Sequence, residues 1–136
     1  MRRFATFALL FLTACGSDRP TAPSGPQRTQ IHANNFRVDP RSITHTDFTA
    51  PQGGTLVVVV DWTLPSNRIL TSLSTPSCDL YNGGTGCGSF FAQNLQGTKP
   101  AEFRYGGAIA GQAYRVYIAN DGTQTDNGVI NVYLER

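Results

Sequence analysis

The sequence predicts an all-β domain built as an antiparallel β-sandwich, and three observations lead to this prediction. Short runs in which apolar and polar residues alternate recur along the chain, turns rich in glycine and proline separate these runs, and no run after residue 30 has helical periodicity. The composition agrees, since charged residues make up only 15% of a chain that holds 14 glycines and eight prolines. Such a mixture is typical of short strands joined by many turns.

The alternating runs predict about seven or eight strands, as in jelly-roll-like or immunoglobulin-like sandwiches. Residues 56–60 are apolar on both faces, so we expect a central strand covered on both sides that ends near a core Trp62. Residues 31–38 are expected at a sheet edge. The other predicted strands cover residues 43–49, 68–74, 89–95, 101–105, 113–119 and 129–134.

The first residues of the chain form a targeting segment and not part of the sandwich. Arg2 and Arg3 precede nine apolar or small uncharged residues, 4–12. This run is much shorter than the roughly 20 residues that a membrane-spanning helix needs, and it is typical of a signal peptide. Small residues and then Cys15 follow it.

The sequence Leu12-Thr13-Ala14-Cys15 resembles the lipobox of bacterial lipoproteins. The resemblance implies that residues 1–14 are removed as a lipoprotein signal peptide and that Cys15 carries the lipid attachment, with the new amino group often acylated as well. A cysteine thiolate is a suitable nucleophile for this alkylation, and two or more acyl chains hold a protein firmly on a membrane. Gly16, where an Asp would favour the inner membrane, implies the outer membrane of a two-membrane cell envelope. The alternative is an ordinary secretory signal followed by release.

Residues 15–30 are predicted to form a flexible tether, because residues 16–30 contain three prolines, two glycines and no large apolar side chain. The sandwich domain then covers residues 31–136. Loss of Arg2 and Arg3 leaves nine basic residues against nine acidic ones. This balance gives no argument for binding to nucleic acid or to anionic lipid. The predicted partners are the membrane, through the covalent lipid, and an envelope protein or glycan.

Two cysteines remain after Cys15, and in an exported domain Cys78 and Cys87 are expected to form a disulfide across a glycine-rich stretch. Such a short closed loop is worth roughly 2–3 kcal/mol on the chain-entropy account. The alternatives, a redox pair or a metal site, fit less well. A redox pair is usually Cys-x-x-Cys, and structural zinc requires four ligands.

Residues 48–134 resemble the β-sandwich modules known as pre-peptidase C-terminal domains of secreted bacterial proteins. The features that match are Gly53 to Val59, Asp61-Trp62, Asp79-Leu80-Tyr81, Gly111 to Val116 and Val132-Tyr133-Leu134. The resemblance implies a binding or stabilising role without catalysis. The acidic strand that often follows the tryptophan in that family is replaced here by residues 68–71, so a metal role is not carried over.

No catalytic constellation is evident in the sequence. The sequence contains no serine motif of the Gly-x-Ser-x-Gly type that could use His32 or His45 as a base, and the glycine-rich stretch lacks the Lys-Ser/Thr of a phosphate loop. The carboxylates of Asp61, Asp79 and Glu102 show no pairing pattern. We therefore expect no catalytic residues, no metal ligands and no cofactor.

Two stretches remain as candidates for ligand binding. Residues 121–128 are rich in side-chain oxygens and are either a calcium loop or, more simply, a hairpin connection between the last two strands. Tyr117 and Tyr133 fall on the outward phase of these strands. If the strands pair, both rings share a face on which a sugar can stack, or they stabilise the sheet as a cross-strand pair.

The predicted function is that of a membrane-anchored bacterial lipoprotein with a non-catalytic β-sandwich module that binds an envelope protein or glycan, or has a structural role. One alternative is a carbohydrate-binding module that uses Tyr117 and Tyr133. A second alternative is a small envelope hydrolase.

Overall fold

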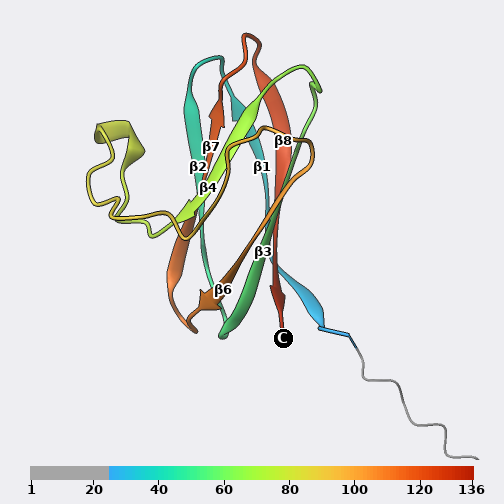
Figure 1. The fold of residues 1–136 in the computed structure, drawn as a ribbon, viewed down its shortest axis with the longest axis vertical. Coiled ribbons are helices and arrows are strands. Elements are labelled where there is room, and N and C mark those ends of the chain that lie inside the picture. The colour runs from blue at the N-terminus through green and yellow to red at the C-terminus, as the bar shows by residue number, and fades with distance from the viewer. Residues whose placement is uncertain (1–24) are drawn as a thin grey trace, which may run out of the picture.

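The computed structural model describes residues 25–136, so the signal segment, Cys15 and most of the predicted tether lie outside the described residues. Two four-stranded antiparallel sheets pack face to face, which confirms the predicted sandwich (Figure 1). Sheet A has the strand order β1-β8-β3-β6, and sheet B has the order β2-β7-β4-β5. The strands are β1 (Arg28–Val38), β2 (Ile43–Thr49), β3 (Gly54–Trp62), β4 (Ile69–Ser74), β5 (Ala92–Asn94), β6 (Ala101–Ala108), β7 (Ala113–Asn120) and β8 (Asp126–Glu135).

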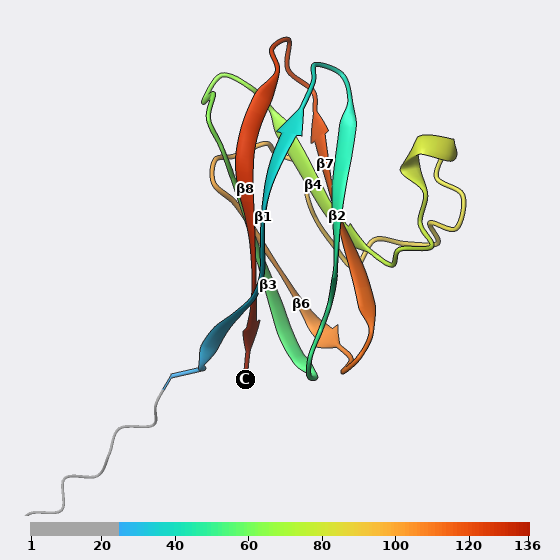
Figure 2. The ribbon, with the colours of Figure 1, turned by 180° about the vertical axis from the view of Figure 1, so that it is seen from behind.

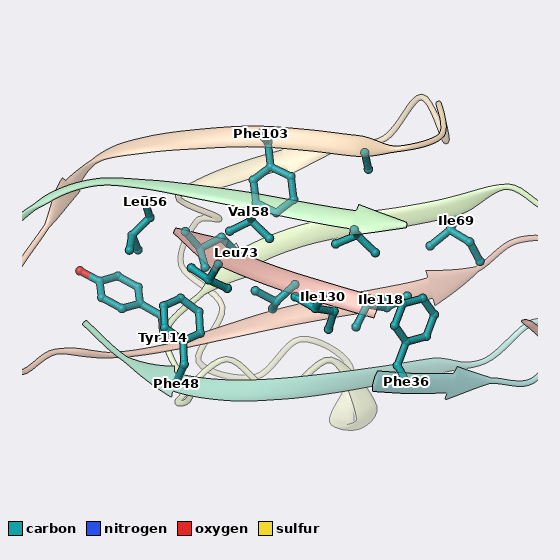
Figure 3. Packing of buried hydrophobic residues seen from close by; sticks show 14 of the residues in the cluster. Phe36, Phe48, Leu56, Val58, Ile69, Leu73, Phe103, Tyr114, Ile118 and Ile130 are labelled. Carbon is teal, nitrogen blue, oxygen red and sulfur yellow. The ribbon is translucent and has the colours of Figure 1, made fainter. Parts of the chain in front are cut away.

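The core lies between the sheets and is formed by every second residue of each long strand, because successive side chains of a strand point to opposite faces (Figure 3). Val58 of β3 and Val132 of β8 are fully buried neighbours in the register of sheet A. Opposite Phe36 of β1, only glycine fits on β8. A Cβ on Gly128 would lie 2.2 Å from the carbonyl oxygen of Asp61 and 2.4 Å from Cζ of Phe36. Trp62 is buried as predicted, and its indole N–H donates to the carbonyl of Asn67.

Most predicted strands are present, although the bounds of several differ from the prediction. β1 lies at the edge of sheet A as predicted but begins at Arg28, three residues before the expected start of the domain at Ile31. β5 contains only three of the seven residues 89–95. β3 is central as predicted, and its outward Val57 is covered by neighbours in the register, Tyr133 and Arg104, instead of by another layer of secondary structure.

The prediction that residues 121–128 join two paired strands is wrong. β7 belongs to sheet B and β8 to sheet A, so this connection crosses from one sheet to the other. Alternation along each strand fixes which side chains face inward, but it does not fix which strands are neighbours.

The sandwich has two distinct ends (Figures 1 and 2). At the tether end, the backbones of Gln27 and Arg136 exchange two hydrogen bonds of 3.2 Å, so the chain enters and leaves the domain side by side. Loops 50–53 and 109–112 lie at this same end. Loops 39–42, 63–68 and 121–125 form the far end.

Candidate functional site

The most distinctive local feature is the 75–91 loop, which connects β4 to β5 and projects from the side of sheet B (Figures 1 and 2). The predicted disulfide between Cys78 and Cys87 closes it. Between the cysteines, Asp79 caps a turn of 3-10 helix, η1 (Leu80–Asn82), by accepting hydrogen bonds from two backbone N–H groups. The side-chain amide of Asn82 also donates to Asp79 and lowers the pKa of this carboxyl. The loop is therefore ordered by its own contacts.

The 75–91 loop is seated on sheet B through Tyr117 of β7. The Tyr117 hydroxyl donates to the carbonyl oxygen of Cys78 at 2.5 Å and accepts from the backbone N–H of Leu80 at 3.3 Å. As a result Tyr117 is only 1% exposed, although its strand position points away from the core. A buried hydroxyl needs such partners, so the loop and the tyrosine depend on each other.

Arg115, two residues earlier on β7, supports the same contact. Its guanidinium donates to both carboxylate oxygens of Asp47 on β2, at 2.6 and 2.7 Å, and to the carbonyl of Cys78 at 3.4 Å. The hydrogen bond from Arg115 lowers the pKa of Asp47. This bidentate pair fixes the arginine beside the foot of the loop.

Three aromatic rings meet where η1 approaches β2. The ring of His45 lies 5.7 Å from the rings of both Tyr81 and Tyr117. The Tyr81 hydroxyl donates to the backbone carbonyl of Ile43, while 54% of the residue remains exposed. The loop thus presents the exposed ring of Tyr81, whose hydroxyl is fixed by its hydrogen bond to β2.

Next to this cluster, the outer face of sheet B carries an apolar groove with a volume of about 220 Å³, which we call the sheet B groove. Its apolar lining consists of Leu70, Leu80, Phe90, Leu95, Tyr117 and Ala119. Leu95, on the segment after β5, is 52% exposed. Arg68 holds this segment over β4 by donating to the carbonyl of Leu95 at 2.7 Å.

The size and lining of the sheet B groove restrict what fits into it. Ligand pockets for whole small molecules usually measure about 300–1,000 Å³ and carry several convergent polar groups. The sheet B groove is smaller, and only three of its nine lining residues, Thr71, Ser72 and Gln93, are polar, with Thr71 itself buried. One or two apolar side chains of a protein partner match it better, as anchor residues do at protein interfaces.

The structure contradicts the predicted pairing of Tyr117 with Tyr133. The two tyrosines lie on different sheets, so they cannot share a face. Tyr117 is buried beneath the 75–91 loop, whereas Tyr133 is half-buried with the guanidinium of Arg28 4.3 Å from its ring centre. A sugar that stacks on both rings is therefore excluded in this conformation.

Residues 121–128 form a hydrogen-bonded network instead of a cluster of cation ligands. Asp126 is buried and accepts from the backbone N–H groups of Thr63, Leu64 and Asn127 and from the side-chain amide of Asn67. Asp121 pairs with Arg41 and Arg68. These carboxylates face donors and cations, an environment that does not suit a calcium ligand. Across residues 25–136 there is no group of three or more His, Cys, Asp and Glu side chains placed to hold a metal ion.

The remaining candidate residues lie apart from one another. His32 stacks on Phe48, and its Nε2 is 3.1 Å from Thr46 Oγ1, so it belongs to the packing between β1 and β2. Asp61 pairs with Lys99 at 2.6 Å beside a shallow hollow of about 470 Å³ on sheet A. Glu102 lies within 4 Å of both Arg28 and Arg104. Of these contacts only that of His32 with Thr46 joins a possible base to a hydroxyl, and the Thr46 side chain is buried.

Sequence reasoning missed the sheet B groove, because its lining comes from four separate segments of the chain. The signal that could have indicated it is the presence of Leu80, Phe90 and Leu95, three large apolar residues close to a glycine-rich connection. No known family model matches the chain, and no curated protein matches it either. Within the described part of the chain, no helix is long and apolar enough to cross a membrane.

Proposed function

We propose that this protein is a bacterial lipoprotein, anchored through Cys15, whose sandwich domain acts without catalysis by binding an envelope protein through the sheet B groove. The observation that carries the binding role is the groove itself. It is an open apolar surface on the outside of a sheet, walled by a loop that a disulfide and a buried tyrosine hold in place. A rigid apolar groove binds with little loss of conformational entropy.

The partner inferred from this surface is a protein segment that inserts apolar side chains. Leu95 lines the groove, and the ring of Tyr81 lies 6.3 Å from that of Tyr117, which also lines it. Both Leu95 and Tyr81 are more than half exposed, and exposed apolar groups that occur together often mark an interaction site. Polar groups next to it come from Gln93, in the lining, and from His45, whose ring lies 5.7 Å from that of Tyr117. An apolar centre with a polar rim is the usual anatomy of a protein interface.

In-cell photocrosslinking from the groove tests the binding role. A photoreactive phenylalanine at Leu95 should crosslink to a discrete envelope protein, and the same group at Thr123 of the far end should not. Ala119→Arg, which places a long charged side chain over the groove floor, should abolish the crosslink. Ala33→Arg, on the outer face of sheet A, is the matched control and should leave it intact. A crosslink that survives Ala119→Arg, or none at all, would contradict the proposal.

Mass spectrometry of the native mature protein tests the anchor separately. We expect an N-terminus at Cys15 that carries the mass of a diacylglycerol, and we expect Cys15→Ser to be released from the membrane fraction or left uncleaved. The sequence motif at residues 12–15 supports this proposal. A mature Cys15 without lipid mass would refute it.

A further inference from the structure

The tether end of the domain combines three features that are absent from the far end. Residues 50–54 and 106–112, which include the loops of this end, contain no charged side chain. Ile109, at the tip of the second loop, is the most exposed large apolar residue of the described chain at 62%. The two termini of the domain meet at this same end. The far end, in contrast, carries the ion pairs of Arg41 and Arg68 with Asp121.

The exposure of Ile109 is maintained by a buried side chain. Tyr114 of β7 is fully buried, and its hydroxyl accepts from the backbone N–H of Ile109 at 3.0 Å and donates to the side-chain oxygen of Gln112 at 3.2 Å. The backbone of Ala50 bonds to Gly111 and Gln112 and so ties the two loops together. A loop held in this way cannot fold its isoleucine inward.

The tether limits how far this end can move from the membrane. Cys15 and Gly25 are ten residue steps apart, which span at most about 35 Å when fully extended. A domain held so close experiences a high effective concentration of lipid, so even a weak surface affinity is enough for contact. This argument rests on the lipid anchor proposed above.

We propose that the tether end rests on the bilayer that holds the lipid of Cys15, with Ile109, Ala110 and Pro51 inserted among the headgroups. Uncharged loops lose little on partial dehydration, while the isoleucine gains from transfer out of water. Arg28, at the same end, lies over the Tyr133 ring and within 4 Å of Glu102 and Glu135, so the contact depends on the uncharged loops and not on a basic patch. The sheet B groove then faces sideways above the membrane, open to a partner.

The test uses the lipidated full-length protein in vesicles of phosphatidylethanolamine and phosphatidylglycerol. An environment-sensitive fluorophore is attached at Ala110→Cys, which is the reactive thiol because Cys78 and Cys87 are joined and Cys15 carries lipid. We expect a blue-shifted emission and quenching by nitroxide groups placed near the headgroups. The same fluorophore at Thr123→Cys of the far end should show neither effect.

Two substitutions on the labelled protein separate membrane contact from simple proximity. Ile109→Asp should remove the blue shift and the quenching at residue 110. Leu95→Asp, which changes the other strongly exposed aliphatic residue but on the side of the domain, should leave both unchanged. Because residues 95, 109 and 110 are exposed, none of these changes should disturb the fold, and circular dichroism checks this.

The possible results separate membrane contact of the tether end from lipid anchoring at Cys15. A protein that pellets with the vesicles but shows no quenching at residue 110 would overturn the membrane contact and leave the anchor standing. A blue shift without lipid quenching would assign the tether end to a protein contact, such as a second copy, and would also overturn it. A protein that does not pellet at all would refute the anchor and the contact together.

Discussion

On the outer face of sheet A, side chains of the strands pack on one another. Arg28 lies over the ring of Tyr133, and Arg104 donates to both carboxylate oxygens of Glu135 at 2.5 and 3.0 Å. On the outer face of sheet B, a separate part of the chain performs this role, since the 75–91 loop closes over Tyr117. Each face has one tyrosine and one bidentate arginine pair. Only on sheet B do the tyrosine and the arginine also bond to a loop, through the carbonyl oxygen of Cys78.

This difference shows that outward residues with the same alternation can be buried to different extents and so contribute differently to stability. Tyr117 and Tyr133 both alternate with inward apolar residues, yet the first is buried and the second is half-buried. What separates them is the connection that follows β4, which is long enough to return over its own sheet. Four experiments test this contrast between the two faces, beginning with the one for which we expect the greatest change in stability.

Removal of each tyrosine gives the largest expected contrast. Tyr117→Ala deletes a buried ring and its hydrogen bonds to the loop, and large-to-small changes of buried aromatic residues cost about 3–5 kcal/mol. Tyr133→Ala removes a half-buried ring under one guanidinium and should cost about 1 kcal/mol. Urea unfolding of both variants measures the difference. Equal losses would mean that the loop contributes nothing to the environment of Tyr117.

Removal of the disulfide should act on the 75–91 loop first. The Cys78→Ala/Cys87→Ala double variant loses a constraint worth about 2–3 kcal/mol on the chain-entropy account. Hydrogen exchange should increase at residues 75–91 and remain slow in β3 and β8, because local opening does not require the core to unfold. An equal increase throughout sheet A would contradict this separation of the two faces.

Two buried threonines should respond to valine with opposite signs. The hydroxyl of Thr71, on β4 behind the sheet B groove, has no hydrogen-bond partner within the described residues, so Thr71→Val should raise the free energy of unfolding by about 1 kcal/mol. Thr46 on β2 bonds to both His32 and Asn34, so Thr46→Val should lower it by about the same amount. Thermal or urea unfolding of both variants decides the signs. A loss of stability in Thr71→Val would mean that its hydroxyl has a partner.

The smallest effect concerns pH. The pKa of Asp47 is lowered in the folded state by Arg115, so this carboxylate stabilises the fold above the unfolded pKa of about 4, and the contribution is lost as the pH falls through the folded value. Since Asp47 is partly exposed, we expect only about 0.5–1 kcal/mol. Asp47→Asn should reduce the loss of stability between pH 6 and pH 3. An unchanged pH dependence would show that the pair adds nothing.

The sequence was sufficient for the strands but not for their arrangement. Alternation located β2 to within a residue and placed Trp62 in the core, because strand periodicity and burial are local properties. It could not reveal that β7 and β8 belong to different sheets, because strand neighbours depend on how connections cross the sandwich. The error in pairing Tyr117 with Tyr133 follows directly from this.

The candidate site was only partly predictable for a related reason. The disulfide followed from cysteine count and spacing, and it was correct. The position of the loop on sheet B depends on a hydrogen bond between Tyr117 and Cys78, which are 39 residues apart in the sequence. No local pattern encodes that contact, so neither the burial of the tyrosine nor the groove beside it was visible from the sequence.

The side-by-side exit of Gln27 and Arg136 also determines how the domain bears a mechanical pull. On the proposed function, a pull between the anchor and a partner on sheet B enters the domain through β1, the first strand of the described chain. The ten residue pairs between β1 and β8 run along β1, and their hydrogen bonds lie across it. The bonds are therefore sheared together instead of being opened one after another. This direction of loading favours resistance when a partner on sheet B moves relative to the anchor.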